Sequence, residues 1–307
     1  AYQKAIDLST TTSELGIIYY ELGTALERVN KTDDAIAAYR KAIIYGSTST
    51  KLDGVYYNLA TALAKANQID DAIAAYRKAI ELNPNRTDSY TALAAILYER
   101  GDLKDAIAAA EKALQLNSNN SSALTTLGAA LSDQGKQEAA STHLKRAIAL
   151  DPNLAEAHNN LGGVLSRQNK VAAGIVEYKQ AIALDPKLAL PYANLGLSLS
   201  EQGKQTEAIA KVKQAIALDP KLARAHTALG VVLLRQNKHS AAIEELKQAI
   251  ALQYHDAPAH FILGLALYDQ GDTQAGITSL KRAKDLSKIQ DNEMMLKRVE
   301  QVLQKVE

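Results

Sequence analysis

Apolar and small residues recur along this chain with a period of 34 residues. The segments Leu144–Pro152, Tyr178–Pro186 and Val212–Pro220 share a run that ends in Ala-Ile-Ala-Leu-Asp-Pro, and they start 34 residues apart. Within each segment the apolar positions have the spacing of one face of a helix. A fixed period of this length is typical of stacked supersecondary units. The sequence therefore predicts an array of short helices instead of two ordinary globular domains.

Each unit also carries a residue that favours a break between two helices. The eight break positions hold only asparagine or glycine, and they are Asn30, Asn67, Gly101, Gly135, Asn169, Gly203, Asn237 and Gly271. These two residue types tolerate the left-handed conformation that ends a helix. Each unit is therefore predicted to be a hairpin of a first and a second helix. Second helices are predicted to end before Pro84, Pro152, Pro186 and Pro220, whereas Pro191 and Pro258 suit the first turn of a helix.

A second signature leads each unit, as in Leu161-Gly162, Leu195-Gly196 and Leu229-Gly230. A small residue follows where the two helices approach closely, such as Ala140 or Gly174, and a large residue stands four positions later. This pattern resembles the tetratricopeptide repeat (TPR) family. The resemblance implies an all-α fold, a solenoid of helix hairpins that forms a right-handed superhelix. The eight predicted repeats span residues 16–49, 53–86, 87–120, 121–154, 155–188, 189–222, 223–256 and 257–290.

The two ends of the chain differ from the repeats. Residues 1–15 look like the end of a truncated preceding repeat and a linker, so an apolar edge is expected there that a second copy of the chain could cover. In residues 291–307, Met295, Val299, Val302 and Val306 share one helical face. This segment is predicted to be a C-terminal capping helix over the last repeat. Self-association through either end remains an alternative.

The charge and the composition exclude several classes of partner. Lys and Arg total 35 and Asp and Glu total 34, so the net charge of +1 gives no general attraction for nucleic acid or an anionic membrane. The sequence has no run of 18 apolar residues, so insertion into a membrane is not predicted. Cysteine is absent, which leaves the redox compartment open. The usage of Ala, Gln and Asp-Pro suggests a bacterial source, and a cytoplasmic location is favoured over a periplasmic one.

Nothing in the sequence predicts catalysis, a cofactor or a metal. No phosphate-binding loop, nucleophile elbow or His-Glu-x-x-His pattern is present. His158, His226 and His260 occupy a repeat position that other units fill with tyrosine, such as Tyr192. They are interpreted as packing residues with a polar tip, because side chains one repeat apart lie about 10 Å from each other and cannot share a metal. The chain is therefore predicted not to be an enzyme.

Binding of a protein or peptide is the favoured function, because stacked helix pairs present an extended concave surface. Asn58, Asn160 and Asn194 each precede the leading signature of their repeat. They resemble part of the asparagine ladder in the TPR arm of O-linked N-acetylglucosamine transferases, which implies a grip on the backbone of an extended peptide. An amide suits that role because it offers donors and an acceptor. A solvated asparagine at this position is the alternative.

Charged and apolar residues extend this candidate surface. Arg167 and Arg235 belong to a row of alternating charge along the first helices, which indicates either a ligand of mixed charge or a solvated face. Leu197, Val231, Phe261 and Leu265 are predicted to form an apolar patch in the groove. The alternative for this patch is that the terminal helix folds back and fills it with Met295 and Val299.

Three function classes follow from this reading. An adaptor or scaffold that binds a peptide or partner protein is favoured. The substrate-recognition arm of a multidomain enzyme, such as a glycosyltransferase, is the second. RNA binding with one base per repeat ranks last, because the alternating charge does not provide a basic groove.

Overall fold

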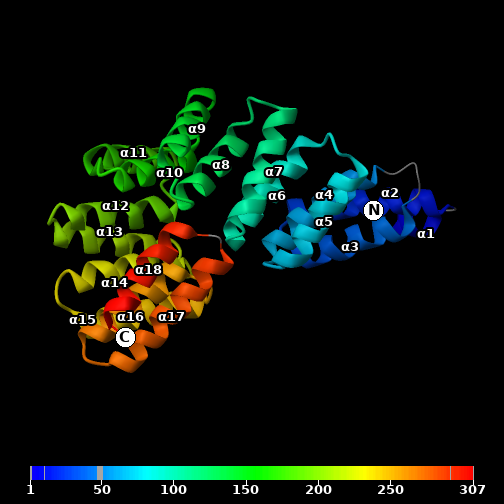
Figure 1. Ribbon diagram of the computed structural model, residues 1–307. Helices are drawn as coiled ribbons and strands as arrows, with labels where there is room; N and C mark the ends of the chain where they lie inside the picture. Colours follow the sequence, from blue (N-terminus) through cyan, green and yellow to red (C-terminus); the bar gives the residue numbers. More distant parts are fainter. Residues whose placement is uncertain (1, 10, 47–50, 291, 307) are drawn as a thin grey trace. The chain divides into compact units, whose positions relative to one another are not determined.

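The computed structural model describes residues 2–9, 11–46, 51–290 and 292–306, and within them every regular element is an α-helix (Figure 1). The helices are α1 (Tyr2–Leu8), α2 (Thr12–Arg28), α3 (Thr32–Tyr45), α4 (Leu52–Lys65), α5 (Ile69–Leu82), α6 (Thr87–Arg100), α7 (Leu103–Leu116), α8 (Ser121–Asp133), α9 (Gln137–Leu150), α10 (Ala155–Arg167), α11 (Val171–Leu184), α12 (Ala189–Glu201), α13 (Gln205–Leu218), α14 (Ala223–Leu234), α15 (His239–Leu252), α16 (Ala257–Asp269), α17 (Thr273–Ile289) and α18 (Glu293–Val306). The predicted all-α fold is confirmed.

The chain divides within α8 into two compact units, Ala1–Thr126 and Leu127–Glu307. The first unit contains the hairpins α2–α3, α4–α5 and α6–α7. The second contains α10–α11, α12–α13, α14–α15 and α16–α17, and in it the part of α8 after Thr126 packs on α9 through the contact of Gly128 with Leu144. Each unit is therefore a stack of helix hairpins in sequence order.

The breaks between first and second helices lie where the sequence predicts them. All eight asparagine and glycine residues at these breaks have positive φ, from 57° at Asn30 to 99° at Gly271. In the described residues no other position has a positive φ. Because other side chains clash in this conformation, these eight residues fix where each first helix ends.

The ends of the second helices are set by the residues before proline. Helices α5, α9, α11 and α13 end two residues before Pro84, Pro152, Pro186 and Pro220, as predicted. At three of these ends an aspartate accepts a hydrogen bond from the backbone two residues later, as Asp185 does from Lys187 at 3.0 Å. Proline has no backbone N–H to continue the helical hydrogen bonds, and the aspartate side chain instead binds the N–H of the residue after proline. Pro258 lies in the first turn of α16, also as predicted.

First helices of neighbouring repeats lie side by side within each unit. In the second unit α10 contacts α12, α12 contacts α14, and α14 contacts α16. In the second unit, each second helix packs against the next first helix, as α11 does on α12. We call the surface formed by α10, α12, α14 and α16 the first-helix face of the second unit. Side chains on this face that point away from the hairpin core are available for a partner.

The N-terminal region starts differently from the predicted repeat boundary. Helix α2 begins at Thr12, four residues before position 16, because the side chain of Thr11 caps it by accepting a hydrogen bond from the backbone of Glu14 at 3.2 Å. Helix α1 packs against α2. The Ser/Thr-rich residues 47–50, at the junction of the first two predicted repeats, lie outside the described residues. Covering of this end by a second copy stays a prediction.

Helix α18 occupies the place that the first helix of a further repeat would take. It packs against α17 and α16, in the same way that α16 packs against α15 and α14. Val299 is fully buried and Leu303 is nearly so, in one cluster with Phe261, Leu280 and Ala283. The apolar face predicted for residues 291–307 is therefore directed against the last hairpin.

Candidate functional site

His158 and His226 of the second unit have matching structural contacts. His158 places one ring nitrogen 2.7 Å from Glu177 Oε2 and the other 3.2 Å from the carbonyl oxygen of Pro152. His226 repeats both contacts with Glu245 and Pro220. The hydroxyl of Tyr192 donates to the carbonyl of Pro186 at 3.2 Å, which is the equivalent contact. These rings therefore fasten each first helix to the preceding loop. Among the described residues no group of three His, Asp or Glu has a metal-binding arrangement.

His260 and Asp256 form a partly buried cluster at the last hairpin. His260 Nε2 lies 3.1 Å from the carbonyl oxygen of Tyr254, and burial lowers the pKa of His260. Asp256 is 8% exposed and caps α16, because its Oδ1 accepts a hydrogen bond from the backbone N–H of Ala259 at 3.0 Å. Burial raises the pKa of Asp256 in spite of that bond. The carboxylate is thus a helix cap that is costly to ionise.

We expect Asp256→Asn to change how stability depends on pH. A raised pKa in the folded state means that the stability contributed by Asp256 is present below the unfolded pKa of about 3.9 and is lost as pH rises through the folded pKa. Asparagine caps a helix as well as aspartate and cannot ionise. The variant should therefore gain stability relative to the parent chain between pH 4 and pH 7, as measured by urea midpoints.

Asp256→Ala is the matched control for this pH prediction. Alanine lacks the capping acceptor, so this variant should lose about 1 kcal/mol at pH 4 and less at pH 7, where the parent carries the costly charge. If the Asn variant is less stable than the parent at pH 7, the Asp256 carboxylate is not costly to ionise in the folded protein.

Three asparagine side chains form a hydrogen-bonded chain on the first-helix face of the second unit. Asn194 on α12 donates from Nδ2 to Asn159 Oδ1 on α10 at 2.9 Å. Asn159 in turn donates from Nδ2 to Asn160 Oδ1 at 3.2 Å. Asn159 is 4% exposed, whereas Asn160 and Asn194 are half-buried. The structure thus joins two of the three predicted asparagines through a third residue, Asn159, which the prediction missed.

The hydrogen-bonded chain leaves one donor end and one acceptor end. Within the described residues, the Asn160 amide nitrogen and the Asn194 carbonyl oxygen have no protein partner beyond this chain. A peptide bond presents one carbonyl and one N–H group. The two free ends therefore match the hydrogen-bonding groups of an extended backbone. Gly163, three residues after Asn160 on α10, has only the Tyr178 hydroxyl within 4 Å of where a Cβ would be, so it leaves room for a backbone to approach.

Asn58 lies in the first unit and has a different environment. Its Nδ2 donates to the hydroxyl of Tyr20 at 3.2 Å. The ring of Tyr20 packs on Tyr39, whose hydroxyl donates to Glu27 Oε2 at 2.6 Å. Burial and the Glu27 carboxylate raise the pKa of Tyr39. Asn58 therefore belongs to an aromatic network and does not extend the asparagine chain of the second unit.

The row of alternating charge forms ion pairs between neighbouring repeats. Arg167 lies 2.8 Å from Asp133 and also donates to the hydroxyl of Ser132 at 2.7 Å. Arg235 lies 3.6 Å from Glu201. Exposed pairs of this kind contribute little to stability, about 0–1 kcal/mol each. Their main consequence is that the charges on this face are already neutralised by one another.

The predicted apolar patch is divided by the position of α18. Leu197 and Val231 are half-buried, and Leu197 packs against the core of the second unit. Phe261, in contrast, is 3% exposed, and Leu265 packs against the same cluster. The guanidinium of Arg298 on α18 lies 5.1 Å from the centre of the Phe261 ring. The expected open groove at Phe261 is therefore wrong, because Met295 and Val299 of α18 pack into the cluster that buries it.

Comparison with known families supports the reading of the repeats. Family models described as TPR repeat match residues 128–169, 167–203 and 198–237, and models described as tetratricopeptide repeat match residues 17–43, 57–121 and 227–288. The chain belongs to the tetratricopeptide repeat family. Tetratricopeptide repeats are generally non-catalytic scaffolds for protein–protein interaction. No curated protein matches this TPR protein in sequence.

Solved structures share the fold at low sequence identity. A tetratricopeptide repeat protein from Parabacteroides merdae is 14% identical with a TM-score of 0.67, and 83% of this chain and 99% of that chain are covered. The APC/C hetero-tetramer Cut9–Hcn1 gives 18% identity and a TM-score of 0.61, with 87% of this chain covered. TTC0263, a thermophilic TPR protein of Thermus thermophilus, is 22% identical with a TM-score of 0.53, and 59% of this chain and 99% of that chain are covered.

The present TPR protein spans about half, 52%, of the Cut9–Hcn1 chain that it matches. At these identities the likeness establishes the fold alone. Among the described helices, none combines the length and the apolar character needed to cross a lipid bilayer.

Proposed function

We propose that this TPR protein is an interaction scaffold that holds an extended segment of a partner protein on the first-helix face of its second unit. The observation that carries the proposal is the hydrogen-bonded chain of Asn160, Asn159 and Asn194, which links α10 to α12 and leaves a donor and an acceptor for a peptide backbone. Backbone recognition requires amides in fixed positions. Here the buried Asn159 holds both of its neighbours in place.

The surroundings of the asparagine chain define the chemistry of the partner segment. Leu197 and Val231 follow on α12 and α14 and offer half-buried aliphatic surface. The neighbouring arginines, Arg167 and Arg235, already have carboxylate partners. A ligand therefore gains little from charge and more from aliphatic contact and backbone hydrogen bonds. The preferred segment is extended, uncharged and aliphatic, and its affinity should change by less than about twofold between 50 and 500 mM salt.

The recognition arm of a larger enzyme is the second candidate. The resemblance of Asn160 and Asn194 to the asparagine ladder of O-linked N-acetylglucosamine transferases favours it. In that case the bound segment would be a substrate of a catalytic domain outside this sequence. Both candidates share the same peptide site, and the sequence of the complete gene product separates them.

The peptide site is tested by selection from a library of 12-residue peptides displayed on phage, followed by measurement of affinity by fluorescence polarisation. Asn194→Ala should weaken the selected peptides about tenfold, because it removes one contact and releases Asn159. Asn58→Ala, in the first unit, should leave affinity unchanged. Methylation of single peptide nitrogens in the ligand should reduce affinity at one central position.

Two outcomes would count against the proposal. Peptides that bind the Asn194→Ala variant as tightly as the parent would exclude the asparagine chain as the site. Selected peptides that are uniformly charged, with affinity that falls steeply with salt, would assign recognition to another surface.

A further inference from the structure

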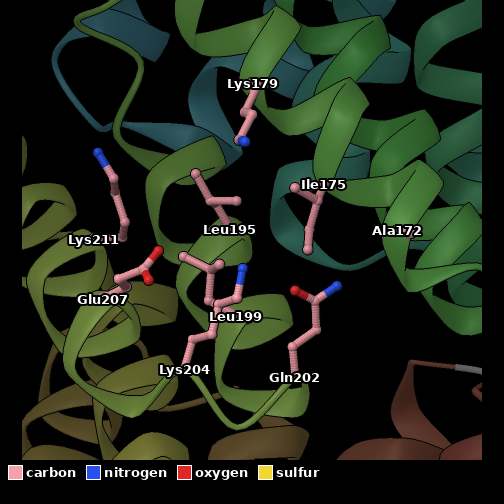
Figure 2. A pocket seen from close by; sticks show the side chains of 9 residues that line it. All are labelled: Ala172, Ile175, Lys179, Leu195, Leu199, Gln202, Lys204, Glu207 and Lys211. Carbon is pink, nitrogen blue, oxygen red and sulfur yellow. The ribbon is translucent and has the colours of Figure 1, made fainter.

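A pocket of about 240 Å³ is lined by residues of the second helices α11 and α13 and of the first helix α12, with the loop that joins α12 to α13. Figure 2 shows the side chains that line it. Ile175, Leu195 and Leu199 supply the apolar part of the lining. Each of these three is at least nine-tenths buried, so they are held in place by the core of the second unit. The pocket therefore has a rigid aliphatic floor.

The size of the pocket indicates the kind of group it can accept. Sites for small molecules and cofactors typically measure about 300–1,000 Å³. This pocket is smaller and lacks histidine, serine or tyrosine in its lining. It has room for a single aliphatic side chain, which is the size of the anchors that partner proteins insert into surface pockets.

The rim of the pocket is basic. Lys179, Lys204 and Lys211 surround it and are opposed only by Glu207, which leaves a charge of +2 on the lining. Among the described residues of the second unit, the ion pairs do not involve Lys179 or Lys204. Lys211 donates to Gln214 at 3.3 Å and lies 5.6 Å from the centre of the Tyr192 ring. The ammonium groups of Lys179 and Lys204 are thus available to an incoming carboxylate, and Lys211 can exchange its bond to Gln214 for one.

One lysine of the rim, Lys211, distinguishes the repeat at 189–222 from the two repeats on either side of it. The repeats before and after it place a histidine and a glutamate in contact, as in His158–Glu177 and His226–Glu245. In the middle repeat the same two positions, 34 residues along, hold Tyr192 and Lys211. The tyrosine keeps the contact with the preceding loop, so the exchange is not required by the fold. Its effect is to replace a carboxylate at the rim with an ammonium group.

We propose that this pocket is a second binding site, which accepts an acidic segment of a partner protein with one aliphatic side chain between carboxylates. The aliphatic side chain contacts Ile175, Leu195 and Leu199, and the flanking carboxylates pair with Lys179, Lys204 and Lys211. Aliphatic burial supplies affinity, and the complementary charge supplies orientation and selectivity. The site uses different residues from the asparagine chain and stands independently of it.

The experiment follows the methyl signals of Ile and Leu by NMR in the intact chain during titration with the peptide acetyl-Asp-Glu-Leu-Glu-Asp-amide. The signals of Ile175, Leu195 and Leu199 should shift and saturate. A peptide with Ser in place of Leu, and one with Lys in place of the acidic residues, should bind at least about tenfold more weakly. Affinity for the acidic peptide should fall about tenfold between 50 and 500 mM salt.

The matched variant restores the pattern of the neighbouring repeats. The double substitution Tyr192→His with Lys211→Glu reproduces the His–Glu contact found on both sides, so the helices should stay folded by circular dichroism. It should weaken the acidic peptide about tenfold, because the rim loses its positive charge. Lys145→Glu, one repeat before Lys179 on α9, changes the net charge by the same amount outside the pocket and should have less than a twofold effect.

Four results would overturn the pocket proposal. Equal weakening by Lys145→Glu and by the double variant would mean general attraction to a basic surface. Equal binding of the Ser peptide would show that the aliphatic floor is not used. Binding that the double variant leaves unchanged would place the site elsewhere. A single-stranded oligonucleotide of equal charge that produces the same methyl shifts at lower concentration would assign the surface to nucleic acid. Asn194→Ala should leave this peptide unaffected, which separates this test from that of the peptide site.

Discussion

Val299→Asp should detach α18 from the last hairpin while the rest of the second unit stays folded. Val299 is fully buried between α18 and the hairpin of α16 and α17. An unpaired carboxylate in that place would cost about 3 kcal/mol or more. The helix can avoid this cost by leaving the surface, so the loss is limited to the free energy that docks α18. Each repeat contacts only its neighbours, which confines the change to the C-terminal end.

The release of α18 is measured by hydrogen exchange and by binding of the dye ANS. Amide protons of α18 should lose protection, and the newly exposed Phe261 and Leu265 should increase dye fluorescence. Gln301→Asp is the control, since Gln301 is on the same helix but exposed, and it should change neither signal. If Val299→Asp keeps α18 fully protected, Val299 is not the contact that holds this helix.

The position of α18 also explains where prediction from sequence ended. The apolar face formed by Met295, Val299 and Val302 could be recognised from spacing alone. Its target could not, because the sequence left Phe261 either open to a partner or covered by this helix. The two outcomes differ in a contact between segments that lie about 35 residues apart. Sequence periodicity carries no information about such pairing.

Local features were predicted most completely. Conformational preference acts within one residue, so asparagine and glycine at the eight breaks and proline after the second helices were sufficient to locate the turns. The start of α2 was missed by four residues, because Thr11 caps a helix that extends beyond the repeat. A threonine followed three residues later by Glu14 was the available signal.

The sequence predicted residues of the candidate site but not the hydrogen bonds that join them. Asn160 and Asn194 were found from their place in the repeat, but the buried Asn159 that joins them was not. The adjacent pair Asn159-Asn160 was the signal, because no other repeat has two asparagines at these two repeat positions. Likewise the row of alternating charge was visible, whereas its neutralisation by pairs such as Arg167 with Asp133 depends on the distance between repeats.

The adjacent glycines Gly162 and Gly163 on α10 should respond in opposite directions to alanine. A Cβ at Gly162 would lie 2.7 Å from the ring of Tyr178 and 3.0 Å from the carbonyl oxygen of Gly174. Overpacking of this kind costs about 1–3 kcal/mol. A Cβ at Gly163 would meet only the Tyr178 hydroxyl, at 3.8 Å. There alanine should gain the helix preference of about 0.8–1 kcal/mol over glycine.

The two glycine variants are compared by urea denaturation followed by circular dichroism. Gly162→Ala gains the same helix preference, so its net loss should be about 0–2 kcal/mol, and Gly163→Ala should unfold at a higher urea concentration than the parent. Repeat two already holds Ala60 opposite Tyr76, which shows that a hairpin built around alanine can accept a tyrosine. If Gly162→Ala is as stable as Gly163→Ala, then α10 and α11 can move apart to the spacing that accommodates Ala60 and Tyr76 in repeat two. In that case the close approach at Gly162 does not fix the distance between the two helices.

Gly163→Ala should in addition weaken peptides selected on the first-helix face, because the new methyl group occupies the space beside Asn160 that a peptide backbone would use.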